Sequence, residues 1–294
     1  MVRKYLINSD FEVDYLGQDP PGSTPELFAP QLLKTESHET DCCFSPEGDE
    51  LYFTRSSHDF TECSVYRMVK KDNAWGLPQP LPFGGIGRCS YAVVSPLDHR
   101  IYLNVFKAGT GKMEIHSVER RVEGWGTPQP VAALNEPGSH SSFPAIALNG
   151  NLYFHSDRRG GMGAQDIYCS TIIAGRHSEP VNLGPPLNTA HNEFHPYVAP
   201  DERFIIFDSK GRGDAVGRQD LYISFRSEEG SWTPPRNLGK EINSETGDFR
   251  ARLSPDGFYL FFSSNRENGG HDGIQNIYWV ETGFIEDMRQ ESIL

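Results

Sequence analysis

The sequence predicts an all-β protein folded as a single ring of five four-stranded blades, a five-bladed β-propeller. Three observations predict this fold. A strand–turn–strand unit recurs every 50 to 55 residues, further strand-like segments follow it, and one such segment stands alone near the N-terminus. A length of 294 residues with 37% apolar residues is compatible with one large all-β domain and its core. We therefore expect residues 1–294 to form one domain.

Each repeat begins with two strands joined by a tight turn. The aligned turn residues are Ser45, Ser95, Ala147, Ala199 and Ser254. Pro-Asp-Gly-like residues beside several of them favour a hairpin, because Pro presets φ and Gly accepts positive φ. We expect the five hairpins to begin near residues 39, 89, 141, 193 and 248. A third run, rich in aromatic and β-branched residues, follows each hairpin and predicts a third strand.

A fourth segment indicates how the ring closes. It reads WGLPQPL at 75–81 in the first repeat and recurs at 125–131, 177–183 and 232–238. The fifth hairpin has no such segment after it, whereas GSTPELF (22–28) precedes the first hairpin. We expect residues 22–33 to complete the last blade, because this closure removes two exposed sheet edges. The alternative is a ring of six blades whose extra, degenerate blade is built from residues 1–21.

Composition excludes some partners and gives an expectation for the compartment. A formal charge of −13 repels phosphate backbones and anionic lipid headgroups, so we expect neither nucleic acid nor a membrane as partner. The five cysteines are odd in number and show no CxxC pair, and no signal peptide or membrane span is recognised. These features favour the cytoplasm; the alternative is the periplasm, if a signal peptide has been removed.

Candidate binding residues come from the channel-lining strands. One repeat position, three residues before the apolar residue that leads into the turn, is occupied by five unlike side chains: Asp41, Tyr91, Phe143, His195 and Arg250. The end of the second strand is equally varied, with Thr54, Asn104, His155, Asp208 and Ser263. A structural role would favour repetition, so this variety predicts a surface that is free for binding.

From these positions we expect a ligand-binding set of Asp41, Tyr91, His195, Arg250 and Arg252, supported by Glu193 and His155. Carboxylate, imidazole and guanidinium groups that converge on one cavity suit a small polar or anionic molecule, or the end of a partner chain. The alternative is that these side chains pair with one another and with water to seal a polar channel.

The repeats resemble a known family. SPDG followed by YLFFSSNR (254–266), HSDRRGGMGAQDIY (155–168), NLGPPLNTAHNEFHPYVAPD (182–201) and YLGQDPPGSTPELFAP (15–30) are similar to the WD40-like repeats of TolB-type β-propeller proteins. The resemblance covers nearly the whole chain and implies the propeller fold. It implies several possible functions, because the family includes scaffolds for protein contacts and sugar-processing enzymes.

The leading interpretation is a non-enzymatic propeller that binds its ligand at the channel mouth without a cofactor. A protein-interaction scaffold is one alternative. A second alternative is an enzyme, either a metal-assisted carbohydrate lyase or a glycoside hydrolase in which two carboxylates serve as acid and base. If a divalent metal is present, we expect His155, His195 and His140 to hold it. No GxSxG or HExxH motif assigns a catalytic residue.

Overall fold

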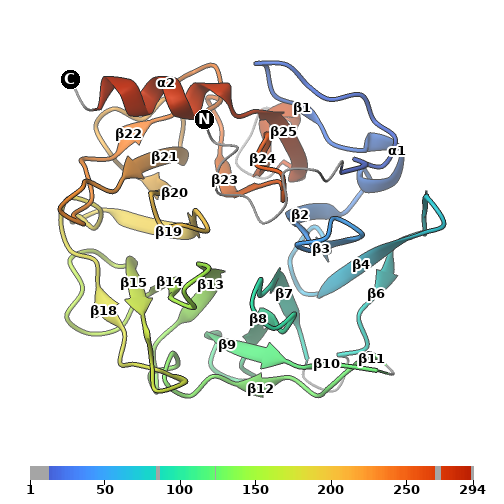
Figure 1. Ribbon diagram of the computed structural model, residues 1–294, viewed down its shortest axis with the longest axis horizontal. Helices are drawn as coiled ribbons and strands as arrows, with labels where there is room; N and C mark the ends of the chain where they lie inside the picture. Colours follow the sequence, from blue (N-terminus) through green and yellow to red (C-terminus); the bar gives the residue numbers. More distant parts are fainter. Residues whose placement is uncertain (1–12, 84–86, 123, 269–272, 293–294) are drawn as a thin grey trace.

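Five antiparallel sheets surround a common axis in the computed structural model, which describes residues 13–83, 87–122, 124–268 and 273–292 (Figure 1). This arrangement confirms the predicted five-bladed β-propeller. In each blade the first strand lies innermost and the short fourth strand lies at the outer edge, as Figure 1 shows for β19 and β22.

The first three blades follow one another along the chain. Blade 1 consists of β2 (His38–Phe44), β3 (Glu50–Ser56), β4 (Cys63–Lys71) and β6 (Gln79–Pro80), with β5 (Ala74–Trp75) also paired to β4. Blade 2 consists of β7 (Cys89–Val94), β8 (Ile101–Phe106), β9 (Met113–Val118) and β12 (Gln129–Pro130), beside the small ribbon of β10 (Arg120–Arg121) and β11 (Gly124–Trp125). Blade 3 consists of β13 (Ser141–Ile146), β14 (Leu152–Ser156), β15 (Asp166–Ser170) and β18 (Val181–Asn182), beside the ribbon of β16 (Ile172–Ile173) and β17 (Arg176–His177).

The last two blades differ in the origin of their fourth strand. Blade 4 consists of β19 (Asn192–Val198), β20 (Phe204–Lys210), β21 (Asp220–Phe225) and β22 (Arg236–Asn237). Blade 5 consists of β23 (Asp248–Leu253), β24 (Tyr259–Ser264), β25 (Asn276–Glu281) and β1 (Glu26–Leu27). The N-terminal strand therefore completes the C-terminal blade, and Figure 1 shows the blue β1 beside the red β25.

Ring closure is reinforced by aromatic packing next to β1. Phe28, which is 1% exposed, lies against Trp279 and Phe261 with ring centroids 5.1 and 4.9 Å apart. Tyr15 packs on the same Trp279 and donates its hydroxyl to Asp256 at 2.6 Å. The described residues 13–21 form no strand and therefore supply no sixth blade. Residues 1–12, the rest of that alternative, lie outside the described residues.

Every innermost strand contains one residue in the left-handed backbone conformation. These five bulge residues are Asp41, Tyr91, Phe143, His195 and Arg250, with φ between 44° and 65°. At each of them the pairing with the second strand shifts register, which is the behaviour of a β-bulge. Positive φ is uncommon for residues other than Gly and is maintained only where the surrounding structure holds it.

A hydrogen bond from the neighbouring blade holds each bulge. The backbone N–H groups of Tyr91 and Phe143 donate to Thr54 and Asn104 of the preceding blade, each at 2.8 Å. The remaining pairs are His195 to His155 and Arg250 to Asp208, both at 3.0 Å, and Asp41 to Ser263 at 3.3 Å. The last of these pairs joins blade 5 to blade 1. The five acceptor residues, which we predicted to line the channel, thus form a closed circuit of blade-to-blade hydrogen bonds.

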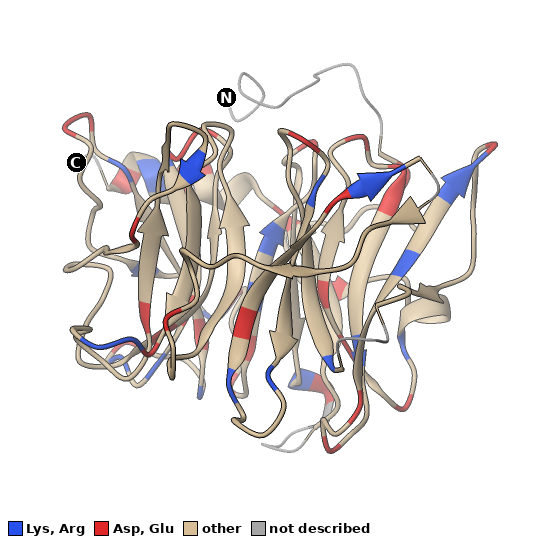
Figure 2. Ribbon diagram, turned by 90° about the horizontal axis from the view of Figure 1, so that it is seen from below, with Lys and Arg blue, Asp and Glu red and all other residues tan. Residues whose placement is uncertain are grey.

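A short C-terminal helix is the main element that sequence patterns did not predict. Helix α2 (Gly283–Glu291) lies outside blades 4 and 5, where Ile285 joins the core around β21, β24 and β25. The other elements are α1 (Pro30–Leu33) and the 3₁₀ turn η2 (Arg266–Asn268). Neither helix of the described chain is long and apolar enough to cross a membrane. Charged residues gather mainly in the loops and at strand ends on the two faces of the ring (Figure 2).

If closure depends on the packing of the N-terminal segment, Phe28→Ala will lower the free energy of unfolding by about 3–5 kcal/mol, the usual effect of emptying a buried Phe site. Urea unfolding monitored by circular dichroism measures this change. Leu77→Ala, at a residue 71% exposed, is the matched control and should change stability by less than about 0.5 kcal/mol. Equal stability of the two variants would show that the N-terminal segment does not close the ring.

Candidate functional site

The side chains of the bulge residues meet around the axis of the ring. The rings of Tyr91 and Phe143 lie 4.5 Å apart between centroids, and Phe143 contacts the imidazole of His195 at 4.0 Å. The guanidinium of Arg250 lies 5.4 Å from the Phe143 centroid, and its Nε is 3.4 Å from Oδ1 of Asp41. Blade 3 thus contributes a phenylalanine. The other four blades add the carboxylate of Asp41, the phenol of Tyr91, the imidazole of His195 and the guanidinium of Arg250.

His195 and Asp208 form the most defined polar pair in this site. The imidazole Nδ1 lies 2.8 and 2.9 Å from the two carboxylate oxygens, so Asp208 accepts a hydrogen bond from Nδ1–H. Gln219 donates to Asp208 Oδ2 at 2.5 Å, and the Arg250 backbone donates to Oδ1. Asp208 is fully buried, and Nε2 of His195 has no hydrogen-bond partner among the described residues. This arrangement fixes the imidazole tautomer and leaves Nε2 available as an acid or base.

Asp41 supplies a second carboxylate. Its Oδ2 accepts a hydrogen bond from Thr40 Oγ1 at 3.0 Å, whereas its buried Oδ1 accepts none and faces the Arg250 guanidinium. Arg250 also donates to the side chain of Gln275 at 3.2 Å. The Asp41 side chain is 2% exposed, and those of His195 and Arg250 are 11% and 18% exposed. A carboxylate, an imidazole and a cation are therefore grouped near the axis, and the imidazole and the cation are more exposed than the carboxylate.

Three other members of the expected binding set direct their polar groups elsewhere: Glu193, Tyr91 and Arg252. Both oxygens of Glu193 are used inside blade 4, where they accept from Thr189 and from Arg212 at 2.9 Å. Arg252 donates to the hydroxyl of Tyr91 and extends toward the turns at the other end of the axis. The bulge-side site therefore consists of Asp41, His195 and Arg250, oriented by Asp208.

Two of the three histidines predicted as metal ligands already use both ring nitrogens. Nδ1 of His155 accepts the His195 backbone N–H, and its Nε2 lies 2.9 Å from Ser142 Oγ. His140 accepts the Met113 backbone N–H at Nδ1 and contacts Ser142 Oγ through Nε2 at 2.6 Å. Within the described ranges no three His, Cys, Asp or Glu side chains are placed to hold a metal ion. His155, His195 and His140 thus do not fit a common metal site.

Sequence analysis missed three glutamines that border the site. Gln165, Gln219 and Gln275 each precede the third strand of a blade, in QDIY, QDLY and QNIY. Gln219 orients Asp208, and Gln275 accepts from Arg250. The side-chain oxygen of Gln165 is buried and has no hydrogen-bond partner. The signal was their repetition directly before the third strand, whereas the predicted site residues came from positions that vary between repeats.

Comparisons with solved structures find the same fold in several glycoside hydrolases. No protein-family model matches the chain, and no curated protein matches it. Similar solved structures include a thermostable family-43 glycoside hydrolase, with a TM-score of 0.55 and 11% identity over 82% of this chain and 88% of that one. An α-L-arabinofuranosidase from Lactobacillus brevis gives 0.51 and 11%, over 85% and 93%. The GH43_1 enzyme from Xanthomonas citri complexed with xylose gives 0.55 and 16%, over 84% and 88%.

These likenesses correct the leading functional interpretation. We expected a non-enzymatic binding module, but the similar structures carry the names of glycoside hydrolases, which favours the hydrolase alternative. At an identity of 11–16%, the structural likeness establishes the common fold alone. The activity has to be argued from the side chains of this chain, because one fold supports many chemistries.

The two neutral histidines of blade 3 predict acid sensitivity. Burial lowers the pKa of His140 from 6.5 to about 4 and lowers the pKa of His155 well below 6.5. Between pH 6.5 and 4 the unfolded chain therefore binds more protons than the folded chain, and the free energy of unfolding falls as the pH is lowered. Urea unfolding at pH 8, 6, 5 and 4 measures this fall.

The variant His155→Asn isolates one of these groups, because Asn104 makes the same blade-to-blade hydrogen bond in blade 2. At pH 8 the variant should retain a cooperative unfolding transition. At lower pH its stability should decline less steeply than that of wild type, by up to about 1.4 kcal/mol per pH unit. Parallel stability curves for the two proteins would contradict a buried, neutral His155.

Proposed function

We propose that the protein is a glycoside hydrolase whose reaction centre is the bulge-side site. The observation that carries the proposal is that Arg250 contacts both the Asp41 oxygen that accepts no hydrogen bond and, through its backbone, Asp208 of the His195–Asp208 pair. Cleavage of a glycosidic bond by water needs one group to accept a proton from water and another to donate a proton to the leaving oxygen. The likeness to family-43 hydrolases supports the same class of reaction.

In the proposed reaction, the Asp41 carboxylate takes a proton from the water that attacks the anomeric carbon. Protonated His195 donates its Nε2 proton to the departing glycosidic oxygen, so that both products leave as hydroxyl compounds. Asp208 stabilises the imidazolium and keeps its ring in place. Proton exchange with solvent then restores both groups. Arg250 lies beside this carboxylate, with its Nε 3.4 Å from Oδ1 of Asp41.

The small exposed area of the site favours a terminal sugar over the interior of a polymer. The exposed side-chain fractions of Asp41, His195 and Arg250 are 2%, 11% and 18%. The named activities of the similar structures include a β-xylosidase and an α-L-arabinofuranosidase. Terminal pentoses are therefore the first substrates to test. We also propose that the repeats are related to those of TolB-type propellers, on the strength of the sequence resemblance.

Hydrolysis of aryl β-xylosides and aryl α-L-arabinofuranosides tests the proposal directly. Wild type should release the aryl alcohol, and Asp41→Asn and His195→Gln should each lower kcat by at least about 100-fold. Asp208→Asn should lower kcat while preserving the fold, because Asn in blade 2 also accepts the bulge N–H. Rates across a substrate series, with melting temperatures in parallel, provide the measurement.

The matched controls are Asp98→Asn and His99→Gln in the turn of blade 2, far from the bulge residues along β7. Both should retain wild-type rates. Absence of turnover by wild type, or full activity of folded Asp41→Asn and His195→Gln, would contradict the proposed reaction centre.

A further inference from the structure

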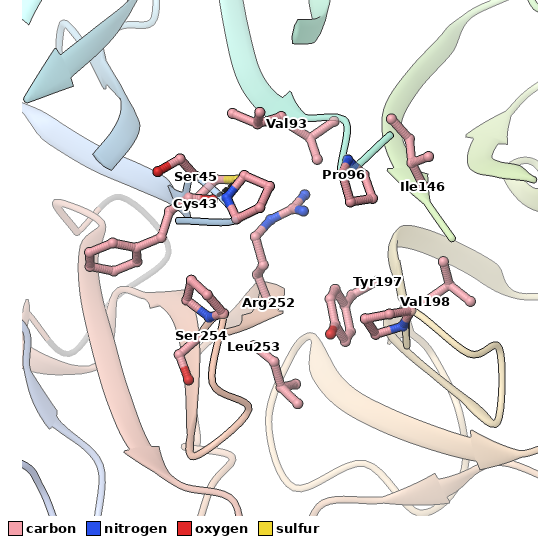
Figure 3. A pocket seen from close by; sticks show the side chains of 15 residues that line it. Cys43, Ser45, Val93, Pro96, Ile146, Tyr197, Val198, Arg252, Leu253 and Ser254 are labelled. Carbon is pink, nitrogen blue, oxygen red and sulfur yellow. Dashed lines mark hydrogen bonds between the residues drawn. The ribbon is translucent and has the colours of Figure 1, made fainter. Parts of the chain in front are cut away.

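A pocket occupies the end of the axis opposite the bulge-side site, among the turns that follow the innermost strands (Figure 3). It has a volume of about 120 Å³ and receives residues from blades 1 to 5. Its wall is largely apolar and includes Val93, Ile146, Val198 and Leu253. This turn-side pocket shares none of its lining residues with the bulge-side site of Asp41, His195 and Arg250.

Arg252 of β23 provides the charge in the turn-side pocket. Figure 3 shows its side chain extending from blade 5 to the centre, with the guanidinium between Cys43, Val93 and Pro96. The residue is 8% exposed. Its Nη2 donates to the Tyr91 hydroxyl, and the guanidinium lies 5.0 Å from the Tyr91 ring centroid. Arginine carries five N–H donors, and within the described chain the Arg252 side chain forms only this one hydrogen bond.

No carboxylate of the described chain neutralises this cation. Three other arginines near the innermost strands have acidic partners: Arg250 pairs with Asp41, Arg212 with Glu193, and Arg266 with Asp248. Arg158 of blade 3 has no carboxylate partner but donates to the Leu134 carbonyl and to two serine hydroxyls. The Arg252 contact is a phenol, and burial raises the pKa of Tyr91 to about 12, so Tyr91 is neutral near pH 7. A buried charge without a counter-ion is unfavourable, and a bound anion would offset that cost.

Pocket size and chemistry restrict the anion. The hydroxyls of Ser45 and Ser254, which also line the pocket, already donate to Asp49 and Asp256 within their own turns. The guanidinium and the Tyr197 hydroxyl are therefore the polar groups available, and the planar fork of the guanidinium matches the two oxygens of a carboxylate. A volume of about 120 Å³ corresponds to roughly four water molecules. The apolar wall suits a short hydrocarbon chain attached to the carboxylate.

We propose that the turn-side pocket binds a short-chain aliphatic carboxylate, with its carboxylate on Arg252 and its hydrocarbon part against Val93, Ile146 and Val198. This site is separate from the proposed hydrolase centre and does not depend on it. Its occupation stabilises the folded ring, because the ligand neutralises a charge contributed by blade 5 and contacts side chains of the neighbouring blades.

Thermal unfolding in acetate, propionate and butyrate, compared with chloride at equal ionic strength, tests the site. At saturating propionate or butyrate the melting temperature should rise by about 3–6 °C above that in chloride. Arg252→Met should abolish this rise and, without carboxylate, should be at least as stable as wild type, because Met removes the unpaired charge. Isothermal calorimetry with propionate should give one site per chain in wild type and none in Arg252→Met.

Two further variants make the result unambiguous. Val198→Phe retains Arg252 but fills the apolar wall, and it should lose the response to butyrate even if Arg252→Met folds poorly. Arg100→Met, at a partly exposed arginine paired with Glu119, should keep the full response. Equal melting temperatures in carboxylate and chloride, a response to inorganic phosphate alone, or an unchanged response in folded Arg252→Met would each overturn the proposal. None of these readouts uses glycosidase activity, so they remain valid if the proposed reaction centre is wrong.

Discussion

The structure depends on one repeated interaction, a side chain at the end of a second strand that accepts the bulge N–H of the next blade. The acceptors are a hydroxyl in Thr54 and Ser263, an amide in Asn104, an imidazole in His155 and a carboxylate in Asp208. Each bond supports a backbone conformation that is strained for a residue other than Gly. Because the circuit includes Ser263 and Asp41, it also joins the two ends of the chain.

This interaction needs an acceptor but does not specify its chemistry, and it places no demand on the side chain of the bulge residue. Five unlike groups can therefore stand at equivalent positions on one axis without loss of the fold. Asp208 illustrates the consequence, since one carboxylate holds the Arg250 backbone and orients His195. The two ends of the axis have also acquired different chemistry, with Asp41, His195 and Arg250 at one end and Arg252 in an apolar pocket at the other.

The sequence predicted the ring because its repeats carry the same turn residues and β-rich runs, and it predicted the displaced fourth strand that pairs Glu26 with Trp279. It also placed Asp41, His195 and Arg250 at one shared repeat position, which the structure shows to be the bulge of each innermost strand. It could not reveal that this position has positive φ, because Tyr, Phe and Arg give no such signal. The repeat pattern likewise could not predict that Arg250 and Arg252, two residues apart on one strand, extend toward opposite ends of the axis. Glu193 varied like a site residue, yet it pairs with Arg212 from the loop that follows β20 of the same blade.

Amide hydrogen exchange of the five bulge residues, measured by NMR, tests the central interaction most directly. The account predicts slow exchange at Tyr91 and Phe143 in wild type, and faster exchange at Tyr91 alone in Thr54→Val, which removes its acceptor. The N–H of Phe143, held by Asn104, is the internal control. Rapid exchange of these amides in wild type, or an unchanged Tyr91 amide in Thr54→Val, would contradict the claim that blade-to-blade hydrogen bonds hold the bulges in place.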